Sequence, residues 1–269
     1  MAYDDGLPSC YHTWDNFLNM IEDLCTTLNY LTPLILAVGN HDVGLNNLAG
    51  VELKIDENTP LYLQFFPQHF RKDSAGNALK EVPNIDERRT YFYHNFSNIL
   101  YLTLDSGYLY DFKGQQLTWM NATMSKFINN IKFAQYHVPT YSSCVNKDVD
   151  KTHNMETLLY WNPLFDHYKM MTVFENHVHL FKRTHKLKAG LIDEKGTLYL
   201  GDGLWGVHAN QCEEEVMEDR IFVKIAKDIH VWVTTISTKE VKHQALGLNG
   251  SFFDQDSQNI TDYIDYISK

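Results

Sequence analysis

The chain has 269 residues, of which 44% are hydrophobic and 13% aromatic, enough apolar material to bury one sizeable core. Its formal net charge of -11 excludes the basic footprint of a nucleic-acid-binding protein and the polybasic patch of a membrane-surface protein. No apolar stretch reaches the roughly 18 residues that a membrane-spanning helix needs. We therefore expect a globular protein whose partners include neither a nucleic acid nor a membrane.

The first third of the chain predicts a helix, a buried strand and a long excursion. Apolar residues recur at helical spacing from Trp14 to Leu28. Residues 33–38 are apolar without alternation, which predicts a strand that is covered on both faces. Residues 43–89 are polar and irregular, and we expect them to lie on the substrate side. The aromatic residues of this excursion are predicted to be core rather than a substrate wall; they are Tyr62, Phe65 and Phe66.

Beyond residue 90 the pattern first alternates between strands and helices and then changes to short strands. The predicted strands are 91–93, 99–104, 131–136, 171–174, 197–200, 222–225 and 230–235, and the predicted helices lie within 114–131 and 155–169. This order predicts an α/β fold in which two sheets pack face to face with helices outside. We expect one domain over residues 1–237, followed by a loosely attached polar tail at 238–269.

Three short histidine-bearing segments each follow a strand-like apolar run. They are GNHD at 39–42, QYHVP at 135–139 and NHVH at 176–179. Side chains at the carboxyl ends of strands are those that an α/β sandwich gathers around a ligand. Asparagine, histidine and aspartate supply oxygen and nitrogen donors that suit iron, zinc or manganese. On an extended segment, His177 and His179 would point to the same side.

Each segment by itself also has a structural explanation. Gly39-Asn40 is a common turn, which would leave His41 as a surface residue. His137 alone would be a hydrogen-bonded core histidine, and NHVH alone could be the polar alternation of a half-buried strand. All three in this order favour a metal site. Residues 182–185, Lys-Arg-Thr-His, are expected to form a solvated charge cluster rather than a phosphate contact.

With these segments in this order, the chain resembles the calcineurin-like metallophosphoesterases and, within them, the purple acid phosphatases. The family motifs run DxH, GDxxY, GNHD/E, VxxH and GHxH, and the last three correspond to the segments above. Three further stretches strengthen the resemblance, namely residues 3–6 with 14–17, residues 104–107 and residues 197–207. The resemblance covers residues 1–237. It implies an α/β fold, a four-layer α-β-β-α sandwich with two mixed sheets that lacks its first strand and helix.

The resemblance implies a centre of two metal ions, iron paired with zinc, manganese or a second iron. The ligands that it implies are Tyr3, Asn40, His137, His177 and His179. Asn40, His137 and His177 would bind one ion and His179 the other. Tyr3 would match the tyrosinate that binds ferric iron in coloured members of the family.

The implied activity is hydrolysis of a phosphate monoester, in which metal-activated water attacks phosphorus and both ions offset the developing charge. His41 would hydrogen-bond the phosphoryl oxygen or protonate the leaving group, a role that suits a histidine. The substrate would be a small-molecule or protein phosphate ester. Two other functions stay open: an inactive remnant that acts as a binding protein, and a phosphodiesterase on the same scaffold.

The chain departs from the family pattern at its start and in the last motif. It begins at Met1-Ala2-Tyr3, so DxH and the Gly-Asp of GDxxY have no counterpart in it. The absent aspartate is the residue that bridges the metals, and Tyr3 with His179 would be too few ligands for the second ion. We therefore expect an incomplete chain. Asn176 replaces the glycine of GHxH and follows Glu175, a change that removes no ligand.

Cysteines and glycosylation sequons bear on the compartment. The four cysteines are widely spread and could form two disulfides or remain four buried thiols; they are Cys10, Cys25, Cys144 and Cys212. Asn-x-Ser/Thr sequons occur at Asn95, Asn121, Asn249 and Asn259, either by chance or because the protein is a glycoprotein. Together with the resemblance, they lead us to expect a secreted or lysosomal/vacuolar protein, although the chain carries no signal peptide.

Overall fold

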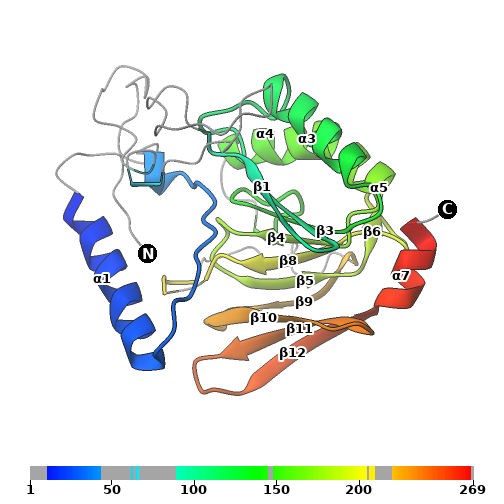
Figure 1. The fold of residues 1–269 in the computed structure, drawn as a ribbon. Helices are drawn as coiled ribbons and strands as arrows, with labels where there is room; N and C mark the ends of the chain where they lie inside the picture. Colours follow the sequence, from blue (N-terminus) through cyan, green and yellow to red (C-terminus); the bar gives the residue numbers. More distant parts are fainter. Residues whose placement is uncertain are drawn as a thin grey trace. The chain divides into compact units, whose positions relative to one another are not determined.

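The computed structural model describes residues 11–43, 62, 65–66, 89–144, 148–204, 206–209 and 220–267. The chain divides into two compact units. Unit 1 contains Met1–Phe92 and Thr103–Tyr110, and unit 2 contains Tyr93–Leu102 and Asp111–Lys269. Figure 1 labels their helices and strands, and each unit is described by itself below.

Unit 1 contains the predicted first helix, α1 (Tyr11–Leu28), and a short 3-10 helix, η2 (His41–Val43). Trp14 on α1 is only 3% exposed, and its ring contacts three other aromatic rings of the unit at centroid distances of 5.1 to 6.2 Å, those of Tyr62, Phe65 and Phe66. The helix and the core position of these aromatic residues are therefore confirmed.

The strand predicted at residues 33–38 is wrong, because this stretch has no assigned strand in the structure. A strand exists only where its backbone pairs with a neighbour. The buried Val38 and the carbonyl of Leu36 are held instead by side chains of the aromatic cluster, and Tyr62 donates a hydrogen bond to the Leu36 carbonyl at 2.8 Å. The apolar run therefore predicted neither pairing nor full burial, since Leu34 is 41% exposed and only Val38 of this stretch is buried.

Unit 2 is built on a mixed sheet, which has seven strands among the described residues, in the order β1-β2-β3-β4-β8-β5-β9. The strands are β1 (Phe92–Phe96), β2 (Ile99–Thr103), β3 (Ile131–Tyr136), β4 (Thr172–Glu175), β5 (Phe181–Thr184), β8 (Leu198–Asp202) and β9 (Phe222–Ala226). Strands β3, β4 and β8 are parallel, whereas β5 is antiparallel to β8 and β9. The short strands β6 (Leu187–Lys188) and β7 (Leu191–Ile192) pair separately.

Helices cover one face of this sheet (Figure 1). They are α3 (Gln115–Lys126), α4 (Asp148–Glu156), the π-helix η4 (Thr157–Trp161) and α5 (Asn162–Tyr168). Trp161 and Phe165 are fully buried against Tyr136 of β3, with ring centroids 5.2 and 6.4 Å from its ring. Both predicted helices are confirmed, although the second begins earlier than expected and contains a π-helical turn.

A second sheet lies on the other face (Figure 1), formed by β10 (His230–Ile236), β11 (Glu240–Gly247) and β12 (Phe252–Asn259) and followed by α7 (Ile260–Ile267). Val241 and Ile260 pack against apolar residues of β3. The α/β fold with two packed sheets is thus confirmed, but the strands described in this second sheet are antiparallel and not mixed.

The expectation of a loose tail at 238–269 is wrong, because these residues supply two strands and a helix. Every second residue of β11 is buried, at Val241, His243 and Ala245. The residues between them are polar, as one face of a half-exposed strand should be. The polar average composition of this segment concealed the alternation.

Candidate functional site

The structure brings His137 and His177 together. Strands β3 and β4 are parallel and in register, with Tyr136 opposite Glu175, so their carboxyl ends meet at one edge of the sheet. His137 follows β3 directly and His177 comes two residues after β4. His137 Nε2 and His177 Nδ1 are 3.0 Å apart, and the two rings are nearly perpendicular, at 69°. Both histidines therefore lie just beyond the carboxyl ends of strands, as the sequence predicts.

The two imidazole nitrogens are hydrogen-bonded to each other, at a separation close to that of two ligands of one metal ion. Two imidazole nitrogens bound at about 2.0–2.1 Å to one tetrahedral zinc ion are roughly 3.3 Å apart. The observed 3.0 Å between His137 and His177 is close to that separation. In addition, His177 has a φ of 62°, a left-handed conformation that costs a non-glycine residue about 1–3 kcal/mol and that concentrates at functional sites.

His179 is oriented in the way that suits a metal ligand. Its Nδ1 lies 3.0 Å from the backbone carbonyl of His208. A carbonyl only accepts, so Nδ1 donates, and in the neutral ring Nε2 carries the lone pair. Metal-binding histidines are commonly fixed by such a bond to a carbonyl. Nothing in the sequence predicts this contact, because the two residues lie in separate loops.

The segment between β4 and β5 is not the extended strand that the sequence reasoning assumed. The amide of Val178 donates to the carbonyl of Asn176 at 2.6 Å, and the amide of Leu180 to that of Val178 at 2.7 Å, which are two successive three-residue turns. Val178 and Leu180 are buried, whereas His177 and His179 are half-buried. The alternation of burial was therefore correct although the backbone conformation was not.

Asn40 and His41 belong to unit 1, where they lie in a tight turn. Asp42 closes this turn twice, because its carboxylate accepts from the Gly39 amide at 2.7 Å and its own amide donates to the Gly39 carbonyl at 3.2 Å. Asn40 is only 6% exposed and His41 is half-buried. Their roles as ligand and as acid stay predictions, and Tyr3 lies outside the described residues.

Glu175 and Lys182 form a buried ion pair beside the two histidine-bearing loops, with exposed fractions of 0% and 2%. Glu175 Oε1 accepts from the Tyr136 hydroxyl at 2.7 Å and from the Thr140 amide at 2.6 Å. Lys182 Nζ contacts Glu175 Oε2 and donates to the carbonyl of Tyr141. Burial lowers the pKa of Lys182, and the carboxylate of Glu175 opposes that shift. The solvated charge cluster predicted around Lys182 is therefore wrong at this residue.

Two glycines of β8 and the following turn allow close packing around this region. A Cβ at Gly201 would overlap the side chain of Lys182, and a Cβ at Gly203 would overlap the backbone carbonyl of Val178. By sequence alone, Gly201-Asp202-Gly203 indicates a turn. The signal that could have revealed more is Gly201, because a glycine within a strand often marks a close approach of another part of the chain.

Asp105 in unit 1 is a buried carboxylate that the sequence indicates only as a strand end. It accepts from the Thr90 hydroxyl at 2.5 Å and from three successive backbone amides, beginning with Tyr108 at 2.7 Å. Burial raises its pKa to about 6, although these hydrogen bonds favour the charged form. Asp105 thus builds the turn at residues 105–110.

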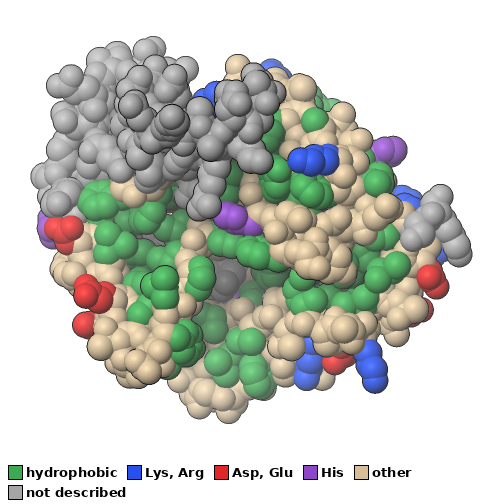
Figure 2. All heavy atoms as spheres, in the orientation of Figure 1, with side chains coloured by type: hydrophobic (Ala, Val, Ile, Leu, Met, Phe, Trp, Pro, Cys, Tyr) green, Lys and Arg blue, Asp and Glu red, His purple; other side chains and the backbone are tan. Residues whose placement is uncertain are grey.

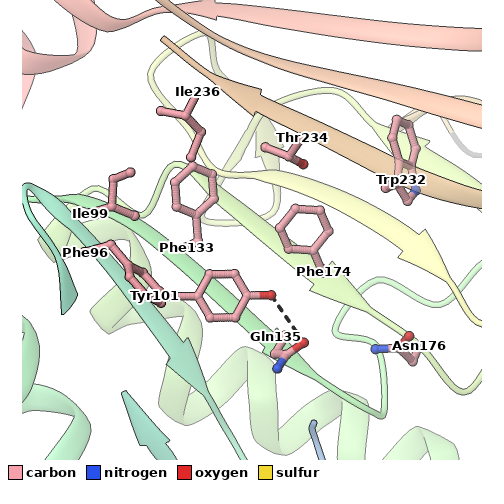
Figure 3. A pocket seen from close by; sticks show the side chains of 10 residues that line it. All are labelled: Phe96, Ile99, Tyr101, Phe133, Gln135, Phe174, Asn176, Trp232, Thr234 and Ile236. Carbon is pink, nitrogen blue, oxygen red and sulfur yellow. Dashed lines mark hydrogen bonds between the residues drawn. The ribbon is translucent and has the colours of Figure 1, made fainter. Parts of the chain in front are cut away.

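A pocket of about 460 Å³ lies between β1–β4 of the main sheet and β10 (Figure 3). Its walls are mostly aromatic and aliphatic, and among its polar residues Tyr101 donates to Gln135 at 3.2 Å. Asn176 lies at one end of it, and its side-chain amide donates to the carbonyl of Tyr136 at 3.0 Å. None of its described lining residues is a predicted metal ligand.

The remaining predictions concern metals, cysteines and charge. Among the described residues, no group of three or more histidine, cysteine, aspartate or glutamate side chains is arranged to hold a metal ion. Cys144 is disulfide-bonded and Cys25 is a free thiol, so neither predicted set of cysteines is correct. On the face shown in Figure 2, the lysine and arginine side chains in the described part are scattered rather than gathered into one patch.

No protein-family model matches the chain. Among curated proteins, it is similar to purple acid phosphatase 15 of Arabidopsis thaliana, with 25% identity over 199 residues that cover 71% of this chain and 32% of that protein. The chain thus spans about a third of the curated relative that it matches.

Two solved structures are similar to the chain. Purple acid phosphatase PPD1 from yellow lupin (Lupinus luteus) seeds has a TM-score of 0.67 at 14% identity, over 95% of this chain and 44% of that chain. PhoD has a TM-score of 0.53 at 8% identity, over 81% of this chain and 50% of that chain. With the layers described above, these likenesses identify the fold of the chain as a metallophosphoesterase fold of the purple acid phosphatase type.

Proposed function

We propose that the protein hydrolyses phosphate monoesters and depends on two bound metal ions. The observation that carries this proposal is the convergence of His137 and His177, whose ring nitrogens are 3.0 Å apart at the carboxyl edge of two parallel strands. His179, two residues further on, is oriented by a backbone carbonyl. Bound ions would supply an activated nucleophile and neutralise charge on the phosphoryl oxygens.

We assign the metal-binding and proton-donating roles to particular residues of the chain. Asn40, His137 and His177 would hold one ion, and His179 with Tyr3 the other, iron together with zinc, manganese or a second iron. His41 would hydrogen-bond the phosphoryl oxygen or donate a proton to the leaving group. The double closure of the turn by Asp42 supports this assignment, because it fixes the backbone on either side of His41.

The test measures bound metal and turnover on the same preparations. The chain is loaded with iron and zinc, its metal content is determined, and hydrolysis of p-nitrophenyl phosphate is compared with that of bis(p-nitrophenyl) phosphate. We expect His137→Ala to lower kcat/KM for the monoester by about 100-fold or more. Loss of a residue that only orients a metal ligand costs about 10- to 100-fold, and loss of a ligand itself should cost at least as much. His167→Ala, an exposed histidine on α5, is the matched control and should leave turnover unchanged.

Three results would contradict the proposal. Metal bound without turnover would make the protein a binding protein, and faster hydrolysis of the diester would make it a phosphodiesterase. Activity that survives in His137→Ala would remove the proposed centre altogether.

We further propose that the protein is secreted or lysosomal/vacuolar. The four sequon asparagines, Asn95, Asn121, Asn249 and Asn259, are all exposed, so each can be reached by a glycosylating enzyme. Within the described ranges, the structure has no helix that is long and apolar enough to cross a membrane.

A further inference from the structure

We infer that the buried pair Glu175–Lys182 positions the two histidine-bearing loops, so that His137 and His177 converge before any ion binds. The inference rests on the proposed function for its purpose, but its geometry stands without it. Glu175 and Lys182 would be positioning residues, because their contacts are to the backbone and side chains of the loops and not to the imidazoles.

The carboxylate of Glu175 reaches both sides of the loop that carries His137. Glu175 ends β4, two residues before His177. Its Oε1 accepts from Tyr136 and from the amide of Thr140, which stand on either side of His137 in the chain. One oxygen atom thus joins the end of β4 to the last residue of β3 and to the loop that follows it.

Lys182 holds the far end of the same loop. It comes from β5 and donates to the carbonyl of Tyr141, the residue after Thr140, while its ammonium also contacts Glu175. The loop at residues 137–141 is therefore tied down at the strand residue that precedes it, Tyr136, and at its last two residues. Because a Cβ at Gly201 would overlap the Lys182 side chain, that glycine leaves the space in which the lysine lies.

The energetic cost of a buried ion pair also favours a positioning role. Such a pair is rarely the most stable way to fill a core, and replacing it with apolar residues of similar volume is often neutral or stabilising. A pair that is 0% and 2% exposed and that holds two loops is better explained by what it positions than by stability. The direct bond between the loops, from the Asn176 amide to the His137 carbonyl at 3.0 Å, completes the same arrangement.

Two double variants at Glu175 and Lys182 distinguish an effect on the position of the two loops from an effect on the stability of the fold. Glu175→Met with Lys182→Met removes both charges and the acceptor oxygen, so the Thr140 amide loses its acceptor and the Tyr136 hydroxyl keeps only the Thr140 hydroxyl. Glu175→Gln with Lys182→Met removes both charges but keeps an amide oxygen at the place of Oε1. The control is Arg183→Met with Asp254→Asn, which removes an ion pair that joins β5 to β12, away from both loops.

The readouts are the dissociation constant for Zn²⁺, the melting temperature, and the imidazole nitrogen resonances of metal-free protein. We expect the Met/Met variant to bind Zn²⁺ about 10- to 100-fold more weakly, the usual effect of losing a partner that orients a ligand. Its melting temperature should fall only modestly, because the buried Thr140 amide loses its acceptor while the cost of burying two charges is removed. The resonances of His137 and His177 should no longer show their mutual hydrogen bond. The Gln/Met variant keeps an acceptor for Thr140 but loses the bond from Lys182 to the Tyr141 carbonyl, so it should bind more tightly than Met/Met and more weakly than the wild type. The control should bind as the wild type does.

The inference would be overturned if the loss of Zn²⁺ affinity in all three variants were proportional to their loss of melting temperature. It would also be overturned by a Met/Met variant that keeps both the affinity and the hydrogen bond between the imidazoles. If the wild-type chain binds no Zn²⁺, the proposed function fails. The imidazole resonances of the metal-free variants then decide the positioning role. A hydrogen bond that is absent in Met/Met and present in Gln/Met supports the role, and one that is present in both variants overturns it.

Discussion

His177 combines a strained backbone conformation with a side chain that lies against His137. Its backbone has a φ of 62°, and its ring lies against that of His137 at a centroid distance of 4.9 Å. Asn176, where the resembling motif has glycine, is not the residue in the left-handed region, since the positive φ falls one position later. The strain thus sits on the residue whose side chain is aimed at the site, and the surrounding contacts must hold it there.

Gly203 makes one of those contacts, and Gly203→Ala tests it. Because the new Cβ would overlap the Val178 carbonyl, the turn between His177 and His179 must shift. We expect Zn²⁺ affinity to fall by about 10-fold or more, as when an orienting partner is lost, measured by competition titration. Gly247→Ala is the matched control, because the nearest atom to its new Cβ lies at 3.4 Å and its affinity should not change. Equal affinities in the two variants would show that Gly203 does not constrain the loop.

At this scale, the sequence predicted which histidines meet but not what fixes them. His137 and His177 followed from apolar runs that end in histidine. The buried state of Lys182 could not be predicted in this way, because a lysine next to Arg183 is usually solvated, and its partner Glu175 lies on another strand. Pairing across strands depends on tertiary contacts that periodicity does not encode.

At the scale of elements, β11 joins the two sheets through a histidine. The ring of His243 lies 3.1 Å from the Thr172 hydroxyl of β4 and 2.9 Å from the Thr234 hydroxyl of β10. Two phenylalanine rings of the main sheet meet it edge-on, Phe133 and Phe174. Burial lowers the pKa of His243 to about 4, so the layer between the sheets requires the neutral ring.

Stability should therefore depend on pH through His243. Its pKa is lower in the folded chain than the ordinary 6.5, so its contribution is complete above pH 6.5 and is lost as the pH falls towards 4. The loss amounts to about 3 kcal/mol. We expect the free energy of unfolding, measured with urea between pH 7 and pH 4, to fall more steeply in the wild type than in His243→Gln.

Asp105 acts in the opposite direction, because its pKa is raised to about 6 and its contribution is lost as the pH rises through that value. Since Asp105 is present in both proteins, it cancels in the comparison. Parallel pH profiles for the wild type and His243→Gln would contradict the assignment to His243.

At the scale of the whole molecule, the chain consists of two units with separate cores. The core of unit 1 centres on Trp14, which is 3% exposed, whereas unit 2 has its own buried tryptophan, Trp161. Helix positions in unit 2 were predictable because they are encoded in local periodicity, and the two packed sheets were predictable from the order of the expected elements. The segment at 33–38 was not, because pairing depends on neighbours distant in sequence. The strands at 240–259 were missed because the polar average composition of that segment concealed the alternation of β11.

Trp14→Ala tests this division. Removing a buried tryptophan from a core costs about 3–5 kcal/mol, and we expect the cost to fall on unit 1. Hydrogen exchange followed by mass spectrometry should show faster exchange in peptides from α1 and unchanged exchange in β3 and β4. Faster exchange in both units to the same extent would mean that they unfold as one cooperative body.

The disulfide at Cys144 gives the site a dependence on redox conditions. Cys144 is 2% exposed and packs with Val178 and Leu180, the two buried residues on either side of His179. A reductant, or synthesis in a reducing cytosol, would leave a thiol beneath these residues and release the covalent tie. Preparations made under oxidising and reducing conditions should therefore differ in the loop that carries His179, and dithiothreitol in an assay buffer is not an inert additive for this protein.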